Sequence, residues 1–236
     1  MVNVYWGTEF IEPMLEIFEE KNAKTTFFVG GTWAIDNEEN LKKILEKGHE
    51  LGNHGYHHKD HDKISEEENL NQIKNTHKIV YELTGVEMNL FAPPSGAYNK
   101  TTVSCATSLG YETIMWTRDT IDWRDHNADL IYNRAIKNSS GGDLILMHPT
   151  EATVKALPRI IDTLQSKGFN MFSGLSGKGV SYELGYSNKC TIGEGEMLEN
   201  VRKIQERNNI KKTKSLDGRN FTVEMETGTG KTYVYT

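Results

Sequence analysis

The chain has 236 residues, a net charge of −6 and a hydrophobic share of 36%. This length suits one large domain, or one domain with a smaller segment attached. The acidic balance and the sequence pI near 5.8 argue against a surface that binds nucleic acid over most of its area. The two cysteines, Cys105 and Cys190, are too few for a disulfide framework or a cysteine metal site. No apolar run reaches the length of a membrane span, and the first residues are not a signal peptide.

The charge is unevenly distributed along the chain. Residues 1–170 carry 17 basic and 25 acidic side chains, whereas residues 171–236 carry 10 basic and 8 acidic ones. We therefore expect two parts, a main domain over residues 1–172 and a short C-terminal α/β fragment over residues 173–236.

Apolar residues along the main part alternate between strand spacing and helix spacing. The expected strands cover residues 2–5, 25–29, 49–53, 89–92, 111–116, 143–147 and 169–172. The expected helices cover residues 10–18, 41–45, 65–83, 100–109, 128–138 and 158–167, and residues 117–123 are expected to form a loop. Ser65 and Glu68 have the spacing of a capping box, Gly85 marks a helix end, and Pro158 suits the first turn of the last helix.

Regular alternation of strands and helices predicts a parallel sheet covered by helices, either doubly wound or closed into a barrel. Seven strand units favour a small, irregular (β/α) barrel. In both architectures the functional residues lie at the carboxyl ends of the strands. Polar and aromatic residues at these ends are therefore expected to meet in one pocket: Asn3, Trp6, His54, Pro94, Ser95, Asp119, Asp122, Trp123 and His148.

A pair of histidines follows the third expected strand. His54 and His58 are four residues apart, which places both imidazoles on one side if the chain turns helically there. Two imidazoles make part of a zinc site, which needs a third protein ligand when it is catalytic. The alternative is that residues 57–62 form a solvated polar loop.

Four motifs in order resemble those of the polysaccharide deacetylases, the NodB-homology proteins of carbohydrate esterase family 4. His54-Gly55-Tyr56-His57-His58 is similar to the metal motif H-[ST]-x-x-H of that family. Residues 91–96 resemble F-R-P-P-Y-G, residues 119–123 resemble D-x-x-D-W, and residues 146–148 resemble L-x-H. The resemblance covers residues 1–170 and implies a (β/α) barrel of the NodB type.

The resemblance also implies a metal-dependent hydrolase that removes N-acetyl groups from amino-sugar polymers such as peptidoglycan or chitin. It assigns His54 and His58 as ligands of a divalent metal, usually zinc in this family, and His148 as the general acid. Asp122 or Asp119 would orient His148, and the backbone N–H of Ser95, after Pro94, would help to hold the oxyanion. Trp6, Trp123 and Tyr98 could offer flat faces to a sugar, although packing is the simpler role for Tyr98.

The first family motif, T-F-D-D-G, is not matched. The strand reads Val2-Asn3-Val4-Tyr5-Trp6-Gly7, and we expect Asn3 at the position of the catalytic base and Val4 at that of the metal ligand. An amide cannot accept a proton at neutral pH, and an alkyl side chain cannot bind a metal. The arginine that pairs with the base in the family is Ala92 here. Losing both the base and its arginine costs less stability than losing one of them, because no buried charge is left unpaired. We therefore interpret the two differences together as the mark of a variant branch of the family.

The C-terminal segment carries a phosphate-loop pattern. Residues 221–226 are an expected strand, followed by Thr227-Gly228-Thr229-Gly230-Lys231-Thr232, which resembles the loop of helicase-like subunits of type III restriction endonucleases. Gly228, Gly230, Lys231 and Thr232 would contact phosphates. The sequence has no room for the following helix and the acidic strand that ATP hydrolysis needs. We expect a loosely docked segment with a helix near 194–208.

Two functions of different kinds remain for the main domain. The first is a metal-dependent deacetylase, weakened by the missing carboxylates. The second is an inactive deacetylase fold that binds an N-acetylated glycan. A fragment of an ATP-dependent restriction or helicase protein is a third possibility that depends on the C-terminal segment alone. The oligomeric state and the location stay open, although members of the family usually act outside the cytoplasm.

Overall fold

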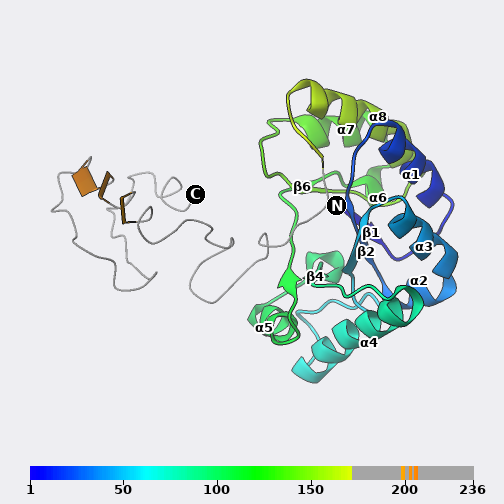
Figure 1. Cartoon of the computed structure of the whole chain (residues 1–236), viewed down its shortest axis with the longest axis vertical. Helices are drawn as coiled ribbons and strands as arrows, with labels where there is room; N and C mark the ends of the chain where they lie inside the picture. The colour runs from blue at the N-terminus through cyan, green and yellow to red at the C-terminus, as the bar shows by residue number, and fades with distance from the viewer. Residues whose placement is uncertain (172–197, 200–201, 204, 207–236) are drawn as a thin grey trace. The chain divides into compact units, whose positions relative to one another are not determined.

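The computed structural model describes residues 1–171 together with residues 198–199, 202–203 and 205–206 (Figure 1). The chain divides into two units, Met1–Lys189 and Cys190–Thr236. In the second unit the six described residues are helical, in agreement with the helix expected near 194–208. The phosphate-loop residues 227–232 lie outside the described residues, as do Phe172 and the strand expected at 221–226.

Five parallel strands form the main sheet of the first unit. They lie in the order β1 (Val2–Val4), β2 (Thr26–Val29), β3 (Glu50–Asn53), β4 (Leu90–Phe91) and β5 (Glu112–Thr113). A second parallel pair consists of β6 (Arg118–Asp119) and β7 (Ile145–Leu146). A bridge between Val2 and Met147 joins the end of β7 to β1, which curls the strands toward a barrel. The predicted parallel α/β fold is confirmed.

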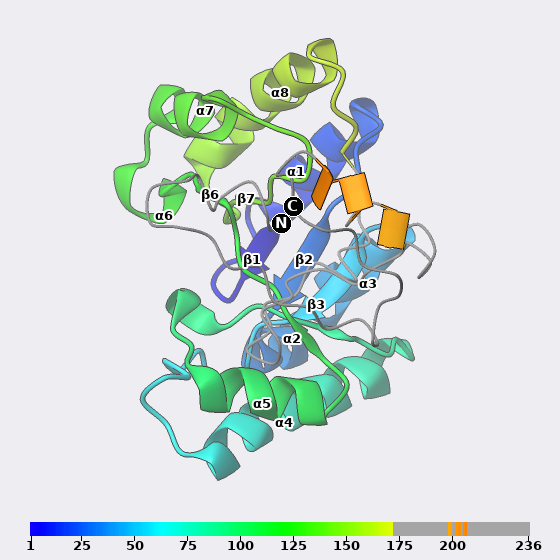
Figure 2. The same cartoon turned by 90° about the vertical axis from the view of Figure 1, so that its left-hand side faces the viewer.

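Helices cover the strands on the outside (Figures 1 and 2). Near the main sheet lie α1 (Ile11–Glu20), α2 (Gly31–Asp36), α3 (Glu38–Glu46), α4 (Glu66–Thr84) and α5 (Lys100–Ser108). The remaining ones are the short α6 (Asp122–Asp125), α7 (Ala128–Ile136), α8 (Glu151–Ser166) and the 3-10 turn η1 (Pro94–Gly96). Helices α7 and α8 pack side by side, and Arg159 of α8 lies 4.3 Å from the ring centroid of Tyr132 on α7.

Several expected boundaries were wrong for identifiable reasons. Pro158 lies inside α8 and not in its first turn, because Thr150 caps the helix by accepting a hydrogen bond from the N–H of Thr153. Strand β6 lies within the loop expected at 117–123, helix α6 begins within it at Asp122, and α2 was not expected. Residues 169–171 are not a strand, although the carbonyl of Met171 accepts a hydrogen bond from the N–H of Lys24.

The cap of α4 is only half of the predicted box. The hydroxyl of Ser65 accepts a hydrogen bond from the N–H of Glu68, at 3.2 Å, and Gly85 ends the helix in the left-handed conformation with φ of 72°. The carboxylate of Glu68, however, binds Lys59 and Gln72 and does not return to the N-cap. A competing ion pair thus replaced the reciprocal bond of the box.

Alternation along the strands separates two apolar clusters. Val2, Val4 and Phe27 belong to the large core between sheet and helices, whereas Phe28 joins a smaller cluster with Leu90, Ala92 and Ile114. This smaller cluster fills the barrel side of the sheet. Gly52 on β3 makes room for it, because a Cβ atom there would stand 2.5 Å from the ring of Phe28.

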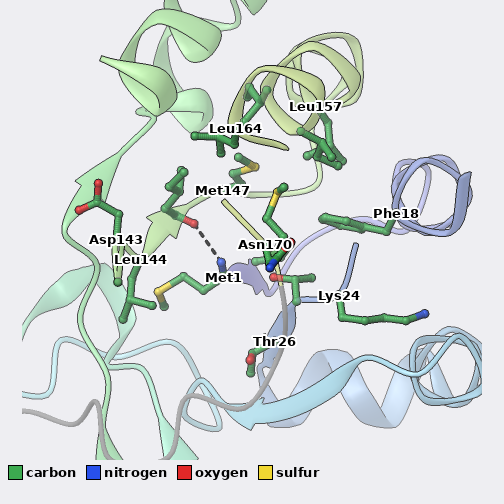
Figure 3. Close-up of a pocket in the computed structure, with 17 residues that line it drawn as sticks. Met1, Phe18, Lys24, Thr26, Asp143, Leu144, Met147, Leu157, Leu164 and Asn170 are labelled. Carbon is green, nitrogen blue, oxygen red and sulfur yellow. Dashed lines mark hydrogen bonds between the residues drawn. The ribbon is translucent and has the colours of Figure 1, made fainter. Parts of the chain in front are cut away.

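A cavity of about 270 Å³ opens at the amino ends of β1, β2 and β7 (Figure 3). Its walls are mainly apolar and include Phe18, Leu157 and Leu164, with Lys24 and Asp143 at the margin. Functional residues of parallel α/β barrels lie at the opposite, carboxyl ends of the strands. None of the histidines of the expected site lines this cavity. None of the described helices combines the length and the apolar character needed to cross a bilayer.

His49 makes the stability of this fold sensitive to acid. The ring lies 5.3 Å from those of Phe18 and Phe27, and burial lowers the pKa of His49 to about 4. The imidazole of His49 therefore binds a proton more tightly in the unfolded chain than in the folded one. The stabilisation that the neutral, buried ring gives to the fold is complete above about pH 6.5 and is lost as pH falls toward 4. Between pH 7 and pH 5 this costs about 2 kcal/mol.

We expect His49→Gln to lose about 2 kcal/mol less stability than the wild type between pH 7 and pH 5, measured by urea unfolding. His57→Gln is the matched control, because His57 is exposed and should leave the pH dependence unchanged. Equal pH dependence of the wild type and His49→Gln would contradict the role assigned to this histidine.

Candidate functional site

The residues predicted for the site follow the carboxyl ends of four strands. His54 comes directly after β3, Pro94 follows β4, Asp122 follows β6 and His148 follows β7. Burial lowers the pKa of both His54 and His58, and the nearby His148 lowers both slightly further. The described structure therefore brings the predicted histidines to one end of the barrel.

The orientation of His54 is fixed by the neighbouring strand. Its Nδ1 lies 2.7 Å from the carbonyl oxygen of Ala92, which can only accept, so Nδ1 carries the proton and Nε2 keeps its lone pair. His54 is buried, and this burial, together with the nearby His58, lowers its pKa to about 3. The ring of His58 stands 5.1 Å from that of His54, and burial lowers the pKa of His58 too. Both imidazoles are neutral at physiological pH.

A buried carboxylate holds the third histidine. Nδ1 of His148 donates to Oδ1 of Asp122 at 2.7 Å, and the backbone N–H of His148 donates to Oδ2 at 2.6 Å. Burial alone would raise the pKa of Asp122, but the hydrogen bonds from His148 and Thr153 outweigh it and hold the pKa below its usual value. This arrangement leaves Nε2 of His148 free to exchange a proton with a ligand.

The structure separates the roles of the two candidate aspartates. Asp122 is fully buried and binds His148, whereas Oδ1 of Asp119 accepts the N–H of Ile121 at 2.8 Å. Ile121 has a left-handed φ of 53°, which is unusual for a β-branched residue, and the bond from Asp119 supports this turn. Asp119 therefore shapes the loop that carries Asp122.

The end of β1 differs from the expectation. Val4 is fully buried in the main core and does not stand at a metal position. Instead, the ring centroids of Tyr5 and Trp6 lie 4.9 and 4.7 Å from that of His58. Asn3 is buried on β1, with a side-chain oxygen that has no hydrogen-bond partner in the described part of the chain. Matching Gly7 to the glycine of T-F-D-D-G would have placed Tyr5 and Trp6 at the two carboxylate positions.

This donor set does not fit a three-ligand metal site. Among residues 1–171 and the described residues of the second unit, no group of three histidine, cysteine, aspartate or glutamate side chains could hold a metal ion. His54 offers a suitable lone pair and His58 lies beside it, but the rings that lie against His58 are those of Tyr5 and Trp6, neither of which supplies a carboxylate. Two imidazoles alone provide an incomplete site.

The remaining predicted residues also follow the carboxyl ends of strands, Trp6 after β1, Pro94 and Ser95 after β4, and Trp123 after β6. Ser95 has a left-handed φ of 56° within η1, and Pro94 beside it is buried. Trp6 and Trp123 are 64% and 56% exposed, which is unusual for such large apolar side chains. Their exposure at strand ends that carry the histidines suits contact with a ligand.

Comparison with known proteins supports the assignment that these motifs indicated. The profile of the family described as polysaccharide deacetylase matches residues 3–114. A peptidoglycan-N-acetylglucosamine deacetylase of Bacillus cereus is 32% identical over 68% of this chain and 78% of its own length. This chain belongs to the polysaccharide deacetylase family. The predicted family membership of the main domain is confirmed, whereas the resemblance of the C-terminal segment stays a prediction.

Two further similar proteins bear on activity. The uncharacterized protein YlxY of Bacillus subtilis is 37% identical over 72% of this chain and 53% of its own length, so the chain spans about half of that relative. The crystal structure of a family 4 pseudoenzyme of Bacillus anthracis is 35% identical, with a TM-score of 0.71 over 73% of this chain and 61% of that one. A mutant of the pseudoenzyme is described as having restored enzymatic activity.

We expect zinc to bind this deacetylase-family domain at least ten- to a hundredfold more weakly than a complete three-ligand site. A competition titration with a zinc-binding dye at neutral pH measures this. His54→Ala and His58→Ala should each remove the remaining affinity, and His57→Ala, at an exposed neighbour, should not. Tight binding that survives His54→Ala would contradict the assignment of the ligands.

Proposed function

We propose that this chain binds N-acetylated amino-sugar polymers at the carboxyl end of its barrel and hydrolyses their acetamide groups weakly or not at all. The observation that carries the proposal is the asymmetry of the site. The His148–Asp122 pair is intact, whereas Tyr5 and Trp6 stand beside His58 where a carboxylate would be needed. Among residues 1–171, the site thus keeps a proton donor and lacks a group that would activate water.

The chemistry of the residues supports binding. Sugar rings present flat apolar faces and polar edges, which exposed tryptophans and histidine nitrogens complement. Trp6 and Trp123 are both exposed. Peptidoglycan deacetylases among the relatives give the class of ligand that is proposed here.

Hydrolysis is the second candidate, and the retained histidines favour it. Nε2 of His54 has a free lone pair, and Nε2 of His148 can deliver a proton to a leaving amine. What the described site lacks is a base, because neither Tyr5 nor Trp6 accepts a proton at neutral pH. Removal of a general base typically lowers the rate by a hundred- to ten-thousandfold.

Binding to a chitin oligomer tests the main proposal. We expect measurable binding of tetra-N-acetylchitotetraose by calorimetry, without added metal. Trp6→Ala and Trp123→Ala should each weaken it by about tenfold, the value of a lost aromatic contact of roughly 1.4 kcal/mol. Tyr81→Ala is the control, because Tyr81 is also exposed but lies on α4. Absence of binding at millimolar oligomer, or equal weakening by Tyr81→Ala, would refute the proposal.

Restoring carboxylates tests the reason for weak hydrolysis. We expect Tyr5→Asp with Trp6→Asp, in the presence of zinc, to raise acetate release from the same oligomer by on the order of a hundredfold or more. Addition of Ala92→Arg should increase this further, since a partly buried carboxylate gains from a cationic partner.

The control is the pair Asn3→Asp and Val4→Asp, at the positions that the sequence alone selected. Val4 is fully buried in the core, so this pair should destabilise the fold without raising hydrolysis. If Asn3→Asp alone restored activity and the pair at residues 5 and 6 did not, the first family motif would begin two residues earlier than the structure indicates.

A further inference from the structure

The first turn of α8 contacts the carboxylate that holds His148. The hydroxyl of Thr153 donates to Oδ2 of Asp122 at 2.6 Å, and both side chains are fully buried. Thr150, the N-cap of the helix, accepts the backbone N–H of Thr153 at 3.1 Å, and the two threonine hydroxyl oxygens lie 2.9 Å apart. The first turn of this 16-residue helix therefore donates a hydrogen bond to the carboxylate of the site.

Proton positions along this chain of hydrogen bonds are determined by the carboxylate. An ionised Asp122 can only accept, so the hydroxyl proton of Thr153 points to it. The hydroxyl of Thr150 then donates to Thr153, which gives the order Thr150 to Thr153 to Asp122. His148 donates to the other oxygen of the same carboxylate. Every hydrogen bond in this set stabilises the charged form of Asp122.

We propose that Thr153 is a positioning residue of this site, which keeps Asp122 ionised and directed at Nδ1 of His148. The inference deepens the proposed function, because it concerns the proton donor of the same site. Without the hydroxyl of Thr153, one oxygen of a fully buried carboxylate would lose a side-chain donor. Helix capping alone does not explain this contact, because the cap uses the backbone N–H of Thr153 and leaves its hydroxyl free for Asp122.

Other charged groups near this turn are paired elsewhere. Arg124 of α6 and Arg134 of α7 both bind Asp125, and Glu151 of α8 binds Lys155. Burial raises the pKa of Asp122, and His148 and Thr153 lower it. The hydroxyl of Thr153 is thus the one neutral side-chain donor among them, and its removal can be isolated by a single substitution.

The test measures the titration of Asp122 directly, by carbon-13 NMR of its carboxyl group, assigned with Asp122→Asn. We expect Thr153→Val, which keeps the shape but loses the hydroxyl, to raise the pKa of Asp122 by about one unit or more. Thr153→Ser keeps the donor and should restore the wild-type value to within a few tenths of a unit. Thr150→Val leaves Thr153 able to donate and should give a smaller increase.

The outcomes separate this inference from the proposed function. A pKa of Asp122 unchanged in Thr153→Val, or raised equally in Thr153→Ser, would overturn the role of Thr153 whatever the activity. If Thr153→Val does not fold, Thr153→Ala decides, because it also removes the hydroxyl, and an unchanged pKa of Asp122 there together with an unchanged nitrogen-15 shift of Nδ1 in His148 would overturn the role of Thr153. Failure to bind chitin oligomers would remove the proposed function and leave the titration result intact.

Discussion

A buried carboxylate is the constraint on which one side of this site depends. Asp122 has no solvent exposure, and an ionised carboxylate without water is stable only when donors surround it. Four hydrogen bonds reach it, from two groups of His148, from the hydroxyl of Thr153 and from the backbone N–H of Trp123. These donors belong to α6, to the end of β7 and to the first turn of α8. One side chain thus fixes the meeting point of three segments.

The other side of the site is held differently. The imidazole of His54 is anchored by a neutral carbonyl of Ala92, and His58 packs against Tyr5 and Trp6. Neutral imidazoles can pack against aromatic rings and a carbonyl without a charged partner. An arginine at position 92 would instead be a buried cation in the small apolar cluster that contains Ala92. The absence of carboxylates directly after β1 therefore matches the absence of an arginine directly after β4.

This division separates the part of the site that the packing of the fold depends on from the part that it does not. The His148–Asp122 pair is tied to the packing of α8, so its removal would leave a buried charge or unpaired donors. The residue Trp6, just after β1, is not tied to the packing of the fold in this way. It is largely exposed and can be replaced without disturbing the core. Relatives in the family include peptidoglycan deacetylases and a pseudoenzyme, which shows that the scaffold accommodates both.

The sequence by itself determined the parallel α/β fold and the location of the site. Strand and helix spacings are local properties, and His54, Asp122 and His148 each follow an apolar strand, so their common end of the sheet could be predicted. The sequence also identified two candidate aspartates but could not choose between them, because the choice depends on which carboxylate reaches His148. Only the tertiary structure gave that contact, and with it the local role of Asp119.

Tertiary packing also decided the residues that sequence spacing misplaced. Val4 was expected at a ligand position, but pairing of β1 with β2 turns it into the core and brings Tyr5 and Trp6 to His58. Helix α8 begins well before Pro158, with Thr150 as its N-cap. The hydrogen bond to the side chain of Thr150 outweighs the preference of proline for the first turn of a helix. Thr153 looked like an ordinary helix residue in the sequence. Its contact with Asp122 joins residues 31 positions apart, and only the folded chain brings such distant groups together.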